Sequence, residues 1–356
     1  MSTGTLDAGP DVALHAVAEP PAEPTARRSR RHDDRRRFTI AVVVGAAVMA
    51  VPFLWVLWDL WSGTIDPLRG IGPDTFYDFQ ARAMFHGHLY LPAGKLGIEA
   101  FLHDGREYTY FGIFPSLIRM PVLLVTSSLD GKLTAPSILI AWLTTGAFSG
   151  LLLWRLRIVI RRGAALAWSE AVTFGLFMAT IMGGSVIIYV ASTPFVYSED
   201  FAWSIPLTLG SLFGLLGVME KPTRGRVVFS GVLILFASLD RTPAGYACVI
   251  GAALVCAWFA LGRGGQANRR WAIPMVAVAG IPFAASCAVT YAKFGLPVGL
   301  PMADQVWAAV NAHRRYFLAA NGGKAFSIAF LPSTLWAYLQ PFGLHLSGIF
   351  PFFSTP

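Results

Sequence analysis

Seven apolar runs recur along the chain and constrain its fold more than any other feature of the sequence. The first, FTIAVVVGAAVMAVPFLWVLWDLW, is long enough to cross a hydrocarbon core of about 30 Å at about 1.5 Å per helical residue. Backbone polar groups in lipid must be satisfied internally, so we expect each run to be a helix. The expected spans are residues 38–61, 134–154, 166–191, 201–219, 226–239, 242–262 and 271–291. The sequence therefore predicts an all-α, polytopic transmembrane helical bundle.

Composition supports this class of protein. Only 13% of the residues are charged and the mean hydropathy is +0.56, whereas a soluble chain carries about 25% charged residues. The run 226–239 is short for a full crossing, so we expect its outer end to be buried in protein. Cys248 and Cys256 are about 12 Å apart along one expected helix, which excludes a disulfide between them.

The distribution of positive charge predicts the orientation of the spans. With the N-terminus in the cytoplasm, the inner segments hold 17 of the 28 Lys and Arg residues, although they are much shorter than the outer segments. This is the asymmetry that the positive-inside rule requires, and every alternation along the chain agrees with it. We therefore expect a multi-pass protein of the cell membrane with residues 62–133 and 292–356 outside the cytoplasm.

The two ends of the chain differ in character. Residues 1–37 are rich in Ala, Pro and charge and end in RRSRRHDDRRR, which predicts a disordered basic cytoplasmic tail. Contact with anionic lipid explains this charge and the net charge of +8, and we expect no nucleic-acid binding. The bundle occupies 38–291, including the outer loop, and 292–356 form an outer C-terminal segment. Its apolar ending, GIFPFFSTP, is what a truncated chain would show.

The outer loop 62–133 has enough pattern to predict structure. Residues 75–86 lack Gly and Pro and are expected to form a helix, capped by Asp74 and ended by Gly87. Asp104 and Gly105 are typical of a hairpin turn. The stretch after Pro115, SLIRMPVLLVTSSL, predicts a helix at the membrane interface. The loop is therefore expected to carry interfacial helices.

The loop also contains two motifs, D-x-x-Y-x-x-x-A-x-x-x-x-x-G-x-x-Y-x-P and D-G-x-x-Y-x-Y-F-G-x-x-P-S-L-x-R-x-P. They comprise Asp74, Tyr77, Ala81, Gly87, Tyr90, Pro92, Asp104, Gly105, Tyr108, Tyr110, Phe111, Gly112, Pro115 and Arg119. With the preceding span, this order resembles the family C (GT-C fold) membrane glycosyltransferases, which use polyprenyl-phosphate sugars. Within that family, it is most similar to actinobacterial integral membrane proteins.

The resemblance implies an inverting hexosyl- or pentosyltransferase acting at the outer membrane face. The donor would be a polyprenyl-phosphate sugar and the acceptor a cell-envelope glycan, lipid or protein. An acidic residue early in the first outer loop would be the general base, and this is Asp74 or Asp78. A partly shielded carboxylate has a raised pKa, which suits that role. The alternatives are a plain helix cap for Asp74 and a solvated first-turn acid for Asp78.

Other residues are candidates for binding the donor. Arg241 and Arg119 could hold its phosphate by charge-assisted hydrogen bonds. Glu199 and Asp200 could form a second acidic site near the sugar, and Tyr110 belongs to the second motif. The alternatives are an ion pair between Asp240 and Arg241, an Arg119 that reaches the lipid headgroups, and ordinary helix-start acids at 199–200.

No cofactor or metal is expected. His86 and His88 flank a glycine at a helix end, which does not fix ligand geometry, so we expect surface or interfacial histidines. Two other functions remain open: a transporter or flippase for lipid-linked sugars, and a non-catalytic scaffold of envelope synthesis. A transporter would place ionisable groups at mid-membrane and often show internal repeats, and the sequence shows neither. The sequence does not identify the sugar, the acceptor or the linkage.

Overall fold

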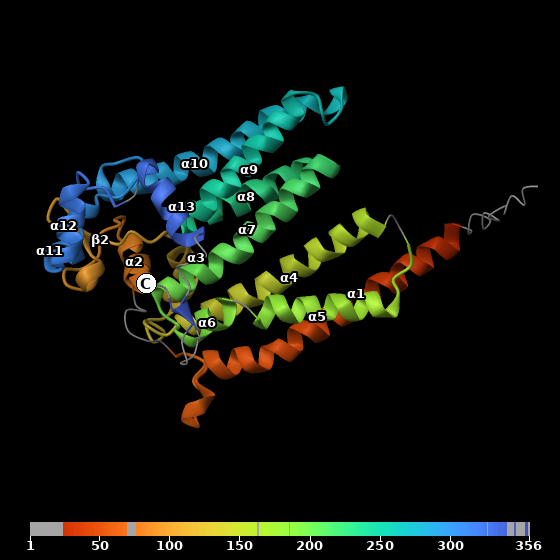
Figure 1. Cartoon of the computed structure of the whole chain (residues 1–356), viewed down its shortest axis with the longest axis horizontal. Helices are drawn as coiled ribbons and strands as arrows, with labels where there is room; N and C mark the ends of the chain where they lie inside the picture. Colours follow the sequence, from red (N-terminus) through yellow and green to blue (C-terminus); the bar gives the residue numbers. More distant parts are fainter. Residues whose placement is uncertain are drawn as a thin grey trace, which may run out of the picture.

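The structure is a computed structural model that describes residues 24–69, 76–161, 164–184, 186–325, 327–339, 345–346 and 353–354. Long helices run side by side, and smaller elements gather over one end of them (Figure 1). We call this end of the molecule the cap. The opposite end carries the basic connections between helices, and we call it the basic end.

The long helices coincide with the predicted spans. They are α1 (Pro24–Leu57), α4 (Thr134–Arg161), α5 (Trp168–Gly183), α6 (Val186–Ser192), α7 (Val196–Glu220), α8 (Arg224–Asp240), α9 (Thr242–Ala260) and α10 (Ala272–Phe294). Six segments of the described chain are long and apolar enough to cross a membrane, with α5 and α6 forming one of them. Helix α8 is not among the six, because its 17 residues reach only about 26 Å. The predicted helical architecture is thus confirmed, with six segments of the described chain that have the length and composition of membrane spans.

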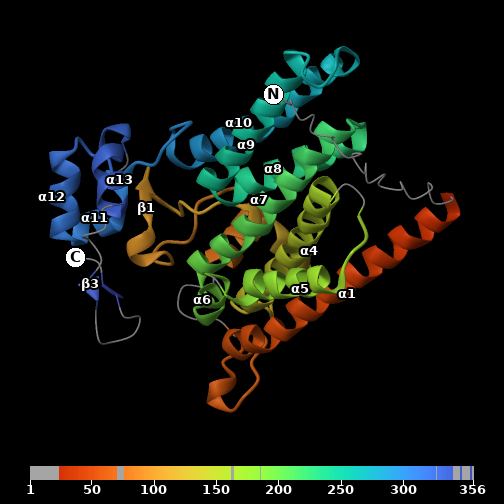
Figure 2. The same cartoon turned by 45° about the vertical axis from the view of Figure 1, so that its right-hand side comes forward.

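The bundle has two apolar cores. One lies among α1, α4, α5 and α6, and the other among α7, α8, α9 and α10. Figures 1 and 2 show α1 and α5 side by side, where Gly45 and Gly175 bring the two backbones close together. Small residues allow such close approach where lipid supplies no hydrophobic driving force between helices.

The N-terminal segment differs from its prediction. Residues 24–37 were expected to be disordered, but α1 begins at Pro24 and continues without a break into the first span. Arginine is a good helix former, and extending an existing helix needs no new nucleus. Residues 1–23 lie outside the described part of the chain.

The outer loop forms the first part of the cap. It contains η1 (Leu60–Ser62), α2 (Phe76–Phe85), η2 (Gly97–Glu99), β1 (Phe101–His103), β2 (Arg106–Tyr108) and α3 (Phe114–Val125). The predicted helix after Asp74 is confirmed, and Gly87 ends it with φ of 77°. The predicted hairpin is also confirmed, because His103 pairs with Arg106 around Asp104 and Gly105, both with positive φ.

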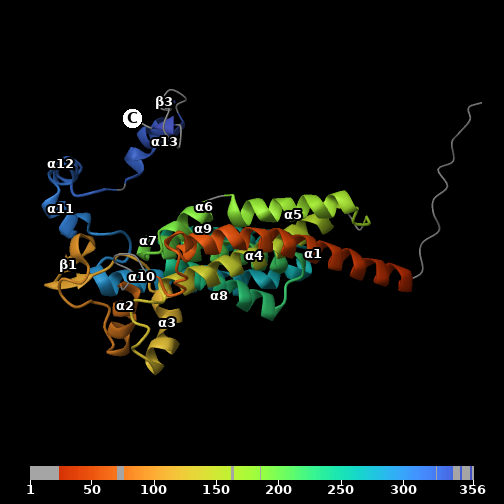
Figure 3. The same ribbon diagram turned by 90° about the horizontal axis from the view of Figure 1, so that it is seen from below.

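The segment after α10 completes the cap. Its elements are η4 (Met302–Asp304), α11 (Val306–Val310), α12 (Ala312–Ala320), η5 (Ile328–Phe330), α13 (Leu331–Leu339), β3 (His345–Leu346) and β4 (Phe353–Ser354). Helix α10 itself is preceded by η3 (Gln266–Trp271). The Val306 amide donates to the Ala100 carbonyl at 2.9 Å, and Phe101 packs in one core with Phe294 and Met302. Figure 3 shows β1, α11 and α12 together at this end of the bundle.

Candidate functional site

Buried charged side chains gather where the cap meets the bundle. They come from α2, α3, α7, α8 and α10, elements that are far apart in the sequence. Such side chains are seldom buried unless they are paired, so a group of them marks a site. The buried members are Asp78, Arg119, Glu199, Asp200, Asp240 and Lys293, and Arg241 adjoins them. We call these seven residues the charged cluster.

Arg119 joins three elements. Its side chain is 2% exposed and donates to Asp78 Oδ1 at 2.7 Å, to Thr134 Oγ1 at 3.0 Å and to Glu199 Oε2. Burial alone would lower the pKa of Arg119, but the Glu199 and Asp78 carboxylates outweigh it and raise that pKa. Arg119 is therefore a fixed cation inside the protein, and the alternative that it reaches the lipid headgroups is wrong.

Asp78 serves as an anchor in this arrangement. It is 2% exposed, so the alternative of a solvated first-turn acid is wrong. One carboxylate oxygen accepts from Arg119, and the other accepts from the Gly131 amide at 2.6 Å. Asp78 thereby holds α3 and the turn that precedes α4 against α2. Asp74, the other predicted base, lies outside the described residues.

Arg241 is the accessible cation of the charged cluster. Its side chain is 31% exposed, lies 3.2 Å from Asp200 Oδ2, and stacks over the Phe201 ring at 3.5 Å. The close ion pair thus joins Arg241 to Asp200, and not to its neighbour Asp240 as the alternative proposed. Asp240 is buried, and within the described chain its carboxylate oxygens have no hydrogen-bond partner.

Two tyrosines of the motifs border the charged cluster. Tyr77 is fully buried, and burial raises the pKa of its phenol well above the usual value, as do the Asp200, Glu199 and Asp240 carboxylates. Tyr77 is therefore a neutral phenol. Tyr110 stacks on Phe111 with ring centroids 4.3 Å apart, and its pKa is also raised by burial and by its hydrogen bond with Tyr197.

Lys293 is a member of the charged cluster that sequence reasoning missed. Its Nζ donates to the carbonyl oxygens of Thr109 at 3.0 Å and Phe111 at 2.7 Å. When the Gln80 amide is oriented to satisfy both of its ends, its oxygen accepts from Lys293 at 3.1 Å. The signal in the sequence was a lone lysine at the end of an apolar run. Lys293 fastens the outer loop to α10.

The histidines lie apart from the charged cluster. His86 is exposed, as predicted, and its Nδ1 lies 2.9 Å from the Arg82 carbonyl oxygen. His88 stacks on Tyr90 with ring centroids 3.9 Å apart, and Arg106 lies over the Tyr90 ring at 4.5 Å from its centroid. In the part of the chain that the structure describes, no three His, Cys, Asp or Glu side chains are grouped to hold a metal.

The geometry of the charged cluster indicates what it can do chemically. The Asp200, Glu199 and Asp240 carboxylates lie near the Tyr77 phenol, Arg119 lies over its ring, and the ion pairs of Arg119 are closed off from solvent. Arg241 alone combines a cation with substantial exposure, so it is the group that could meet an anion arriving from outside. Asp200 and Asp240 lie beside it as possible proton acceptors.

Comparison with known proteins adds no family. No protein-family model, curated protein or solved structure matches the chain.

Proposed function

We propose that the protein is an inverting glycosyltransferase that moves a sugar from a polyprenyl-phosphate donor to a cell-envelope acceptor at the outer membrane face. The observation that carries the proposal is the charged cluster itself, which lies at one end of an apolar bundle under a cap. Polar chemistry at the edge of the bilayer is what a lipid-linked substrate requires, because its chain stays in lipid while its phosphate and sugar reach water.

Arg241 is the proposed phosphate ligand. Its planar guanidinium suits bidentate binding of phosphate, and its exposure leaves it reachable. A donor phosphate would compete with Asp200 for Arg241. Arg119 is instead a positioning residue, since Asp78 and Glu199 already neutralise it.

The general base of the proposal is Asp74 or Asp78. Both oxygens of Asp78 already accept hydrogen bonds, which favours Asp74 as the group that takes the proton of the acceptor hydroxyl. In the reaction, the acceptor oxygen forms a bond to the anomeric carbon, the bond from that carbon to phosphate breaks, and the polyprenyl phosphate leaves. The base takes the proton of the hydroxyl group.

The proposed orientation has seven passes and a cytoplasmic N-terminus. The basic end carries Arg155, Arg157 and Arg161, with ion pairs to Glu170 and Glu220. The positive-inside rule assigns this end to the cytoplasm and the cap to the outside. Helix α8 lies against α7, α9 and α10, so neighbouring helices cover much of its short length.

The test uses membranes that contain the full chain, radiolabelled polyprenyl-phosphate hexoses and pentoses, and an envelope extract. We expect transfer by the wild type and loss of transfer in Asp74→Asn and Arg241→Gln. Asp104→Asn is the matched control, because it is an exposed acid at a hairpin turn that accepts Asn. If transfer persists in both Asp74→Asn and Asp78→Asn, neither residue is the general base. Absence of transfer from every donor would favour a transporter or a scaffold.

A further inference from the structure

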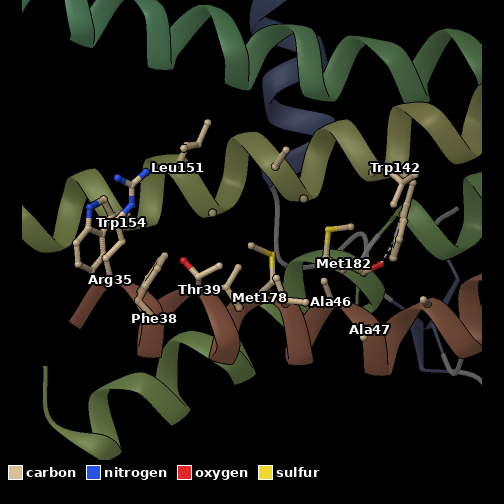
Figure 4. Close-up of a pocket in the computed structure, with 17 residues that line it drawn as sticks. Arg35, Phe38, Thr39, Ala46, Ala47, Trp142, Leu151, Trp154, Met178 and Met182 are labelled. Carbon is tan, nitrogen blue, oxygen red and sulfur yellow. Dashed lines mark hydrogen bonds between the residues drawn. The ribbon is translucent and has the colours of Figure 1, made fainter. Parts of the chain in front are cut away.

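A long apolar groove lies between α1 and α4, away from the charged cluster. Both helices pack on α5, and they contact each other near the two ends of the groove, where Phe38 meets Trp154 and Phe53 stacks on Trp142. Between these contacts the groove has a volume of about 470 Å³. Small residues form much of its walls, and Met178 and Met182 of α5 also line it (Figure 4). The small residues are Ala46, Ala47 and Ala50 of α1 and Gly146, Ala147 and Gly150 of α4.

The groove has one charged end. Arg35 is the only charged residue that lines it within the described chain, and it lies with Trp154 at one end of the groove, while Trp142 lies at the other (Figure 4). This is the basic end of the molecule, where α4 ends at Arg161. An occupant with an apolar body and an anionic head would match this polarity.

The size of the groove decides between a lipid chain and a helix. From Arg35 to Ala50, α1 rises about 22 Å, so even the whole empty space of about 1100 Å³ between the walls corresponds to a mean cross-section of only about 50 Å². A helix about 10 Å across needs about 80 Å². The groove is thus too narrow for a helix of a second copy, but wide enough for one extended hydrocarbon chain.

We infer that this groove binds one acyl chain of an anionic phospholipid from the leaflet at the basic end, with the lipid phosphate held by Arg35. The small side chains leave room for the chain, and the two tryptophans flank its ends. Arg35 distinguishes anionic from zwitterionic lipids. The inference is independent of the proposed transferase activity, because the groove shares no residue with the charged cluster.

The test is native mass spectrometry of the full chain, purified in mild detergent and supplied with phosphatidylglycerol or phosphatidylcholine of identical acyl chains. We expect one phosphatidylglycerol to remain bound to the wild type. In Arg35→Gln, its affinity should fall about fivefold, towards that of phosphatidylcholine. Arg36→Gln is the matched control, since Arg36 is exposed and does not line the groove.

A second pair of variants tests the chain itself. Ala47→Leu with Ala147→Leu should fill the groove and remove the bound lipid, while Val44→Phe with Val48→Phe adds bulk to α1 outside it. Equal retention of phosphatidylglycerol by the filled variant and the wild type would overturn the inference. The inference would also be overturned if the wild type were a dimer and the filled variant became a monomer that still binds the lipid. If the filled variant unfolds, the lipid preference of Arg35→Gln still tests the inference. An Arg35→Gln protein that prefers phosphatidylglycerol over phosphatidylcholine as strongly as the wild type does would overturn the inference.

Discussion

Arg119 links the cap to the bundle through ion pairs with both. It neutralises two buried carboxylates that belong to different helices, one in the cap and one in the bundle. Within the described chain its Nε has no hydrogen-bond partner, so its two Nη groups donate all of its hydrogen bonds. Such a cation stabilises the folded protein because, without it, the two carboxylates would be buried without a partner of opposite charge.

Replacing Arg119 should therefore destabilise the protein strongly. We expect Arg119→Met to lower the free energy of unfolding by about 3–5 kcal/mol, because Asp78 and Glu199 lose their cation. Denaturant titration of the protein in detergent measures this. Arg36→Met, at an exposed arginine, is the control and should change little. Equal losses in the two variants would contradict the role given to Arg119.

Lys293 makes a second connection that can be tested at the residue scale. In Lys293→Met, the carbonyl oxygens of Thr109 and Phe111 lose their donor, which costs about 2 kcal/mol for buried acceptors. We expect faster amide hydrogen exchange across residues 100–112 while α4 keeps its protection. Lys132→Met, at an exposed lysine of the same loop, is the control. Unchanged exchange at 100–112 would show that Lys293 does not fasten the loop.

At the scale of elements, the cap is positioned by a close backbone approach. Gly112, just before α3, lies against the C-terminal end of α8, and a Cβ added there would collide with the carbonyl oxygens of Leu239 and Asp240. The approach places the start of α3 beside the charged cluster. It also explains why a glycine occupies this position in the second motif.

Gly112→Ala should push α3 away from α8. We expect a loss of about 1–3 kcal/mol in stability, because the clash involves backbone that has little room to yield. Gly225→Ala is the matched control in α8, where an added Cβ meets nothing within 4 Å and the helix should gain up to about 1 kcal/mol. Thermal unfolding followed by circular dichroism compares the two. A Gly112→Ala protein as stable as wild type would refute the close approach.

At the scale of the whole molecule, two distant segments build one cap. The hairpin of the outer loop and the segment after α10 share a core, in which Phe101 contacts Phe294 and Tyr110. The bridge between Phe101 and Gln305 adds backbone pairing. The C-terminal segment therefore covers the loop, and the loop in turn covers the charged cluster.

Loss of this core should free the C-terminal segment. We expect Phe101→Ala to cost about 3–5 kcal/mol and to make residues 302–325 sensitive to limited proteolysis. Leu102→Ala, on the same strand but 48% exposed, is the control and should resist proteolysis like the wild type. If both variants are cleaved equally, the shared core does not hold the cap together.

Local patterns in the sequence determined much of the fold. The apolar runs predicted the long helices, and Gly87, Asp104 and Gly105 predicted the ends and turns of the outer loop. These signals act over a few residues, since a helix, a cap or a hairpin turn depends on nearby side chains and backbone. The helix at 24–37 was missed because the apolar span beside it extends a helix into charged residues.

Only the tertiary structure decided how the charges pair. Asp78, Arg119 and Glu199 were candidates in the sequence, but no local pattern could show that Arg119 forms ion pairs with the other two. Nor could a local pattern show that the close ion pair of Arg241 is not with its neighbour Asp240. Nor could the sequence find that Lys293 holds the loop or that α1 and α4 leave a groove between them. Ion pairing and burial depend on which helices pack together, and that is settled by contacts between residues far apart in the chain.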